Sequence, residues 1–234
     1  MIEELDIDTY LYISKNKLQI FVYNKKDQKN LYTQEKIVYD EYNFQDLNEL
    51  SKFLDENIYK IEKLVGNFVK DIILVVENDE NLNVSISIKK KNYNETISKK
   101  DLESSLTELK DLFNENYQEQ NILHMIIVNY IIDERSYSFF VSDLSSDYLC
   151  LEVKFVCISN DLIFKFDKLL TNYQITISKY MCGNYVNNFS KIVNGELTEK
   201  IYKLKNGFND NEVTLVPKNV KNKGFFEKFF QLFS

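Results

Sequence analysis

Several residue types that often mark a catalytic or metal site are scarce in this chain. Its 234 residues include one histidine, three cysteines, one proline, five glycines and no tryptophan. A Ser-His-Asp or Cys-His centre would have to be built around His124, which lies in the apolar run ILHMII, where an inward imidazole is usually a satisfied core group. The cysteines, Cys150, Cys157 and Cys182, have no C-x-x-C spacing, so we interpret them as reduced core residues. We therefore expect no catalytic, metal or cofactor site.

Long apolar runs and an excess of positive charge are missing as well. No stretch reaches the roughly eighteen apolar residues of a membrane-spanning helix, and the beginning, MIEELDIDTY, is acidic where a secretory signal is basic. The formal net charge of −7 argues against a general nucleic-acid binder, because phosphate contacts need clustered Lys and Arg. These features predict a cytoplasmic body with no nucleic acid among its partners.

Local charge clusters have simple interpretations. The acids of ENDEN at 77–81, and Asp133 with Glu134, fall in expected turns, where we expect them to be solvated. The run IKKKN at 88–92 ends an expected strand, and we interpret it as a guard against edge-to-edge aggregation of a sheet. A nucleic-acid role for these lysines is the less favoured alternative, since no glycine-aromatic signature accompanies them.

Period-two patterns dominate the first part of the chain. Residues 10–38 hold the alternating runs YLYIS, LQIFVYN and LYTQEKIVY, which predict a meander of strands. Apolar residues then recur every three or four positions between Leu47 and Val65, which predicts a long amphipathic helix that ends at Gly66. The run DIILVVEN is suited to a central strand and LNVSISIKK to a half-exposed one, and we expect these two to pair through the NDEN turn.

The second part mixes helices and strands, so the expected fold class is α+β. A helix is predicted to open at SKKD, where Ser98 and Asp101 approximate a capping box, and another is predicted in SNDLIFKFDKLLTNY with a Ser or Asn N-cap. The expected strands are ILHMIIVNYIID, SYSFFVS, YLCLEVKFVCI and QITISKYM, and GNYVNNFSKIV is a candidate short helix. Beyond about residue 193 the periodicity fades, and the surroundings of Pro217 predict a tether.

The C-terminal segment GFFEKFFQLFS, residues 224–234, has the most specific chemistry in the sequence. Drawn as a helix it has one broad apolar side, and the basic stretch before it adds positive charge. At eleven residues it is too short to cross a bilayer, but it can lie in the surface of an anionic membrane. An ordinary terminal helix packed on the fold is the alternative. The candidate membrane-binding residues are Phe225, Phe226, Phe229, Phe230, Leu232, Phe233, Lys218, Lys221, Lys223 and Lys228.

The order of elements resembles the first half of the bacterial cell-division protein FtsA, a membrane-tethered family with the actin-like (ribonuclease H-like) fold. The stretch LHMIIVNYIID is similar to that family's L-H-x-I-x-x-x-Y-x-I-D, and the match places six residues: Leu123, His124, Ile126, Tyr130, Ile132 and Asp133. TISKKDLESSLTELK and LEVKFVCISNDLIFKFDKLL also resemble family segments. The resemblance covers roughly residues 10–190.

The resemblance implies a partial actin-like subdomain at 1–84, an inserted strand-helix-strand-strand (SHS2) module at 85–183, a closing segment and flexible tether at 184–223, and a membrane helix at 224–234. It also shows a departure, because the family's D-x-G-[ST] phosphate loop is absent. Two alignments are open: LDIDT with Asp8 at the glycine position, or YISKNK with Tyr12 at the acid and Ser14 at the glycine. A later D-I-G-G-G run is missing too, so we expect no ATPase.

The expected function is therefore a non-enzymatic cell-division scaffold on the cytoplasmic face of the inner membrane. Its partners would be an anionic membrane surface and other division proteins or further copies of itself, with self-association multiplying weak attachment. In the family the ring protein FtsZ is held by the second half, so an FtsZ contact is left open here. The alternatives are a pilus-assembly or secretion scaffold of actin-like descent, and an unidentified small soluble enzyme.

Overall fold

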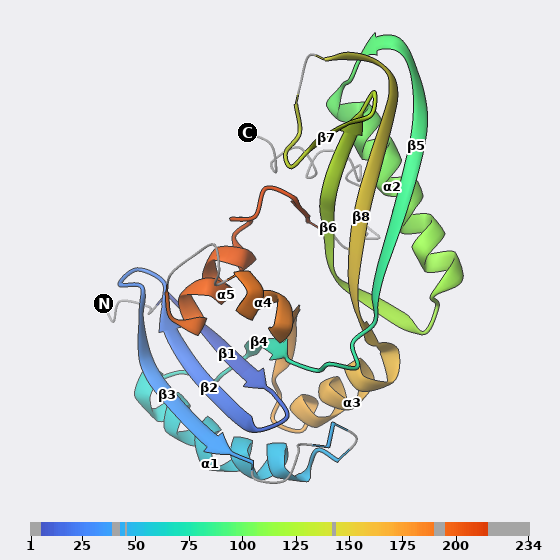
Figure 1. The fold of residues 1–234 in the computed structure, drawn as a ribbon. Helices are drawn as coiled ribbons and strands as arrows, with labels where there is room; N and C mark the ends of the chain where they lie inside the picture. The colour runs from blue at the N-terminus through green and yellow to red at the C-terminus, as the bar shows by residue number, and fades with distance from the viewer. Residues whose placement is uncertain (1–5, 39–42, 45, 142–143, 190–194, 215–234) are drawn as a thin grey trace, which may run out of the picture. The chain divides into compact units, whose positions relative to one another are not determined.

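The chain divides into two compact units, each with a sheet and an apolar core (Figure 1). The computed structural model describes residues 6–38, 43–44, 46–141, 144–189 and 195–214. The first unit comprises the described residues of Met1–Asn81 and Ser159–Asn206, and the second comprises those of Leu82–Ile158 and Gly207–Ser234.

The first unit is built on a mixed sheet. Its elements are β1 (Ile7–Ile13), β2 (Lys17–Asn24), β3 (Lys29–Ile37), α1 (Asn48–Val65), β4 (Asp71–Val76), α3 (Asn160–Thr171), β9 (Thr176–Cys182), α4 (Gly183–Phe189) and α5 (Leu197–Lys205). Among the described residues the strand order is β3-β2-β1-β4-β9. The meander β1 to β3 is antiparallel, whereas β4 runs parallel to both β1 and β9.

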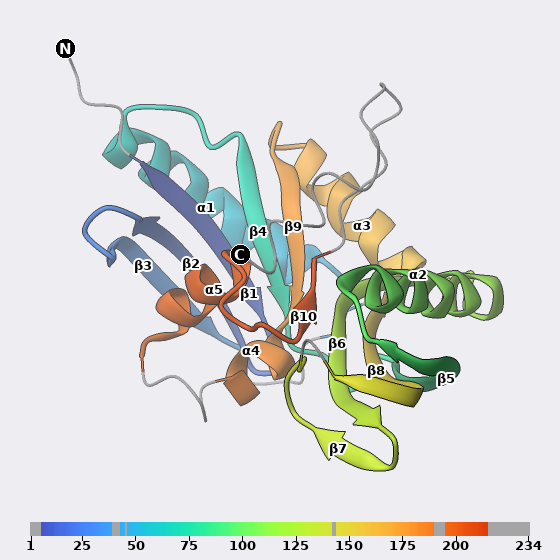
Figure 2. The same ribbon diagram turned by 90° about the horizontal axis from the view of Figure 1, so that it is seen from above.

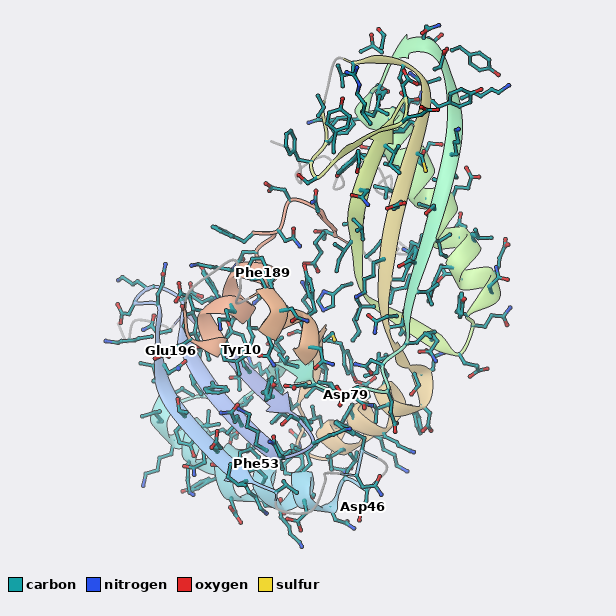
Figure 3. All side chains as sticks on the ribbon, in the orientation of Figure 1. Tyr10, Asp46, Phe53, Asp79, Phe189 and Glu196 are labelled. Carbon is teal, nitrogen blue, oxygen red and sulfur yellow. The ribbon has the colours of Figure 1, made fainter. Side chains whose placement is uncertain are left out.

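Helices cover both faces of this sheet, which explains why β4 is apolar throughout. In β4 every residue after Asp71 is buried, so both of its faces need a partner. Helix α1 lies on one face, and α4 and α5 lie on the other (Figure 2). Phe53 of α1 and Phe189 of α4 mark the two layers, with Tyr10 of β1 between them (Figure 3). On the α4–α5 side, Tyr10 belongs to a cluster of buried aromatic and aliphatic residues.

The second unit contains an antiparallel sheet covered by one long helix. Its elements are β5 (Asn83–Thr96), α2 (Lys99–Asn116), β6 (Gln120–Ile132), β7 (Arg135–Tyr137), β8 (Ser145–Ser159) and β10 (Glu212–Val213). The described strands follow the order β10-β6-β8-β5, and β7 pairs with β6. In sequence order a strand and a helix are followed by the strands β6, β7 and β8 and later by β10, and identity with an SHS2 module stays a prediction.

Helix α2 is held by local and tertiary contacts. The predicted capping box is present, because Ser98 accepts the backbone N–H of Asp101 and the Asp101 side chain accepts that of Ser98. The helix buries an apolar stripe on the sheet, and Phe113 at its far end stacks on Phe155 of β8 with ring centroids 4.8 Å apart. Similar local signals are confirmed elsewhere: Gly66 ends α1 with a φ of 74°, and Ser159 caps α3.

The expected mixture of helices and strands is confirmed, and the partial actin-like subdomain stays a prediction. Three details of the sequence interpretation are wrong. Strand β4 does not pair with β5, because its buried faces and edges are taken by β1, β9 and the helices. Residues 159–182 pair and pack in the first unit, so the insertion expected at 85–183 ends earlier. The stretch expected as closing segment and tether, 184–223, contains α5 and β10.

Candidate functional site

The carboxyl ends of β1, β4 and β9 meet at one edge of the first sheet, which is where open α/β sheets commonly bind ligands. Ile13 pairs with Val76, and Val76 pairs with Cys182, so the residues after each strand come together. We call these residues the strand-end cluster, and its members are Tyr12, Lys15, Glu77, Asp79, Asn184 and Asn187. Asp79 lies just beyond β4 (Figure 3).

The strand-end cluster satisfies its own polar groups. The Lys15 ammonium lies 3.1 Å from the Asp79 carboxylate, which also accepts a hydrogen bond from Asn184 at 3.3 Å. The Asn187 amide donates to Glu77 at 2.9 Å and to the Tyr12 hydroxyl at 3.0 Å. The Lys15 ion pair and the Asn184 bond lower the pKa of Asp79, whereas burial raises the pKa of Glu77.

The hairpin at this edge differs from a phosphate loop. Ser14 donates its backbone N–H to the Lys17 carbonyl at 3.0 Å and its hydroxyl to Asn16 at 3.0 Å, so the β1–β2 turn is closed on itself. Phosphate loops rely on glycine to bring backbone amides to the ligand. Of the two alignments left open, YISKNK occupies the carboxyl edge. Its neighbours there are the acids Glu77 and Asp79, which repel an anion.

The other alignment, LDIDT, lies at the opposite end of β1. Asp8 pairs there with Tyr23 of β2 in the sheet register, far along the strand from Ile13. Its carboxylate accepts two 2.9 Å bonds from Lys205 of α5 and one from Tyr10 at 3.1 Å. Because the side chain is only 10% exposed, Asp8 works as an internal ion pair that ties α5 to the sheet.

A second candidate site is a groove of about 840 Å³ in the second unit, which we call the α2–β5 groove. Ser87 and Ile88 of β5 line one wall, and one face of α2 from Lys100 to Glu115 lines the other. Adjacent strand residues point to opposite faces, so contact with both Ser87 and Ile88 places the outer edge of β5 at the groove. No described strand pairs with that edge.

The α2 wall of the groove carries an apolar floor residue, Leu109, which is buried, and several acidic side chains. The helix positions that line it recur every three or four residues, so they share one face of α2. Leu112 lies on this face and is 45% exposed. Four carboxylates and one ammonium group belong to the wall; they are Glu103, Glu108, Asp111, Glu115 and Lys100. An ion pair of 2.7 Å between Lys90 of β5 and Glu108 joins the strand to the helix.

Glu103 is the unusual member of the α2–β5 groove. It is only 6% exposed, and its Oε1 has no hydrogen-bond partner in the described part of the chain. Burial raises the pKa of its carboxyl group, and the Lys99 ammonium opposes that effect. The sequence interpretation missed this residue. The available signal was an acid directly after Leu102, at the margin of the apolar stripe of α2.

His124 is a buried core histidine, as expected from the sequence. Its Nδ1 lies 2.7 Å from Oε1 of Glu212, and the imidazole is fully buried. Glu212 belongs to β10, which pairs with β6 through Ile126 and Met125. The pair therefore holds the last described strand on the sheet of the second unit.

Other residues considered from the sequence have structural roles. The Asp133 carboxylate accepts the backbone N–H groups of Asp147 and Tyr148 at 3.0 Å, so it orders the start of β8 and is not simply solvated. Lys89 lies over the Tyr148 ring at 4.4 Å on the outer strand β5, in agreement with an edge position. The three cysteines form no disulfide, and burial raises the pKa of Cys157 to about 12.

The membrane-binding residues proposed from the sequence, 218–233, lie outside the described residues. Within the described part of the chain, no helix combines the length and apolarity needed to span a bilayer. The same residues contain no group of three or more His, Cys, Asp or Glu side chains placed to hold a metal ion.

No family model matches this sequence, and no curated protein matches it. A PilM–PilN type IV pilus biogenesis complex is similar at 9% identity over 79% of this chain and 49% of that chain, with a TM-score of 0.48. The cytoplasmic domain of EpsL, an inner-membrane component of the Vibrio cholerae type II secretion system, is similar at 6% identity over 76% of this chain and 57% of that chain, with a TM-score of 0.37. A Bacteroides thetaiotaomicron protein of unknown function with an actin-like ATPase fold is similar at 10% identity over 82% of this chain and 60% of that chain, with a TM-score of 0.29. The chain spans less than two thirds of each. Membership of the FtsA family stays a prediction.

Proposed function

We propose that this chain is a non-enzymatic scaffold of actin-like descent whose second unit binds a segment of a partner protein in the α2–β5 groove. The observation that carries the proposal is the groove beside the outer edge of β5. An extended peptide can add to such an edge through main-chain hydrogen bonds, while side-chain pockets give specificity. The exposed Leu112 and the half-buried Ile88 provide apolar contacts for it.

The strand-end cluster supports a role without nucleotide. The place where an actin-like phosphate loop is expected holds Glu77 and Asp79, and Lys15 already pairs with one of them. We propose a role in pilus assembly or secretion first, and a role in cell division second. The basic and aromatic C-terminal segment would hold the protein at an anionic membrane surface.

Site-specific photo-crosslinking in the host tests the groove as a partner site. A photoreactive amino acid at Ser87 or Leu112 is expected to capture components of a pilus or secretion assembly, because both positions line the groove. The control is the same amino acid at Tyr59 on α1, which is 72% exposed and belongs to the first unit. Capture of the same proteins in equal amounts at all three positions would contradict the groove as a partner site. Capture of septal proteins at Ser87 or Leu112 would favour the cell-division role over pilus assembly or secretion.

Calorimetry separates the scaffold from the enzyme alternative. With magnesium and ATP, we expect no heat of binding, because the strand-end cluster places carboxylates where phosphates would lie. Binding in the micromolar range would overturn the non-enzymatic assignment, whatever the crosslinks show.

Vesicle flotation tests the membrane part of the proposal. The full chain is expected to float with vesicles rich in phosphatidylserine, and deletion of residues 224–234 is expected to remove most of that binding, because the aromatic rings lose their acyl contacts. Neutral phosphatidylcholine vesicles serve as the control for charge. A full chain that stays in the soluble fraction would show that the segment is not an anchor.

A further inference from the structure

The α2–β5 groove is lined by a buried carboxyl group, that of Glu103, with one oxygen that has no hydrogen-bond partner in the described part of the chain. Oε1 of Glu103 makes no hydrogen bond in the described part of the chain, although the residue is more than nine-tenths buried. Buried polar groups in native structures are nearly always paired, because an unpaired one costs free energy. Glu103 lines the groove, but Oε1 itself has almost no accessible surface, so a ligand's donor reaches this acceptor only when the carboxyl group turns toward the groove.

The charges around Glu103 favour a ligand whose donor group is positively charged. Acids outnumber bases here: Glu108, Asp111 and Glu115 line the α2 wall with Glu103, while the bases of this helix face are Lys100 on the wall and Lys99, whose charge acts on Glu103. Glu108 is already matched by Lys90, whereas Asp111 and Glu115 form no ion pair among the described residues. A cation entering the groove is attracted by Asp111 and Glu115 and can satisfy the buried acceptor of Glu103 at the same time.

The shape of the groove favours a cation that is carried by the side chain of an extended peptide. Ser87 and Ile88 place the outer edge of β5 at the groove, so a backbone can align with β5 while one of its side chains reaches toward α2. A lysine or arginine has the length and the donors for this reach. A carboxylate-bearing segment would meet repulsion instead.

We propose that the α2–β5 groove binds an extended peptide segment that carries a lysine or arginine, and that Glu103 receives this side chain's cation. The inference rests on the proposed function, since it names the chemistry of the partner at the same groove. Glu103 is a specificity-determining residue, while β5 and the apolar floor supply contacts that any extended segment can use.

Selection from a displayed library of random short peptides tests this specificity on the full chain. Peptides enriched on the wild-type protein are expected to share a lysine or arginine at one position. The best peptide, labelled for fluorescence anisotropy, is expected to bind Glu103→Gln at least tenfold more weakly. Glu56→Gln is the matched control, because it removes the same charge from an exposed position of α1, outside the groove.

The Glu103→Gln variant is expected to fold, because a neutral side chain of similar size removes a buried charge, and circular dichroism checks this. Slower amide exchange in β5 upon peptide binding is expected to place the peptide at the groove. Enriched peptides without a basic residue, or an unchanged affinity of Glu103→Gln, would overturn this inference and leave the groove as a partner site. Enriched peptides that leave the exchange of β5 unchanged would overturn the groove itself, and with it the proposed function.

Discussion

Replacing Gly183 by alanine is expected to destabilise the protein by about 3 kcal/mol, because the added methyl group overpacks a site that cannot expand. A Cβ at this position would lie 2.6 Å from Cβ of Glu77 and 2.8 Å from the backbone N and Cα of the same residue. Glu77 directly follows β4, which is fixed between β1 and β9. Urea unfolding followed by circular dichroism measures the loss.

Gly66→Ala is the matched control in the same unit. Gly66 has a φ of 74° with nothing within 4 Å of an added Cβ, so only the left-handed backbone opposes the change. That conformation costs an alanine about 1 kcal/mol. The loss for Gly183→Ala should therefore clearly exceed that for Gly66→Ala. An equal or smaller loss would mean that α4 can move away from β4 at little cost.

Replacing His124 by alanine is expected to cost about 3 kcal/mol and to loosen β10 from the sheet of the second unit. The change leaves the Glu212 carboxylate, which is only 10% exposed, without its imidazole partner, and breaking a buried pair in this way is strongly destabilising. Urea unfolding gives the free energy. Amide hydrogen exchange gives the location, because the Ile127 N–H donates to the Asn211 carbonyl beside β10.

Glu212→Gln provides the comparison for this pair. A glutamine keeps a hydrogen-bonding group at 212 and removes the charge, so its loss should be less than that of His124→Ala. Faster exchange at Ile127 is expected in the alanine variant. If His124→Ala unfolds at the wild-type urea concentration with Ile127 still protected, the pair has no part in holding β10.

Local features of the fold could be predicted from the sequence because their causes are local. The capping box depends on Ser98 and Asp101, which are three residues apart, and the end of α1 depends on Gly66 alone. The apolar run of β4 indicated a central strand for the same reason. Each of these signals lies within one turn or one strand of the feature that it predicts.

The partners of β4 could not be read in the same way. Its neighbours β1 and β9 are far away in the sequence, whereas β5 follows it directly, and periodicity says which face is buried without saying what buries it. Helix α5 was missed because its apolar residues, such as Ile201 and Leu204, are few and stand among lysines. The two residues of β10 are too short to form any pattern.

The candidate site shows the same division. The missing phosphate loop could be read from one segment of the sequence, because the hairpin after β1 contains no glycine. The α2–β5 groove depends on two elements whose contact is tertiary, so Glu103 looked like an ordinary surface acid of a helix. Only its burial and its unpaired oxygen distinguish it from neighbours such as Glu108.

The docking of β10 also determines where mechanical tension would enter the protein. A membrane-held segment after Thr214 would pull first on Val213 and Glu212, which are bound to the edge of β6. Two backbone pairings and the buried contact between His124 and Glu212 would then bear the load, before the stacked aromatic core of α2 and β8 is strained. Strand β10 would therefore be the first connection to yield under force.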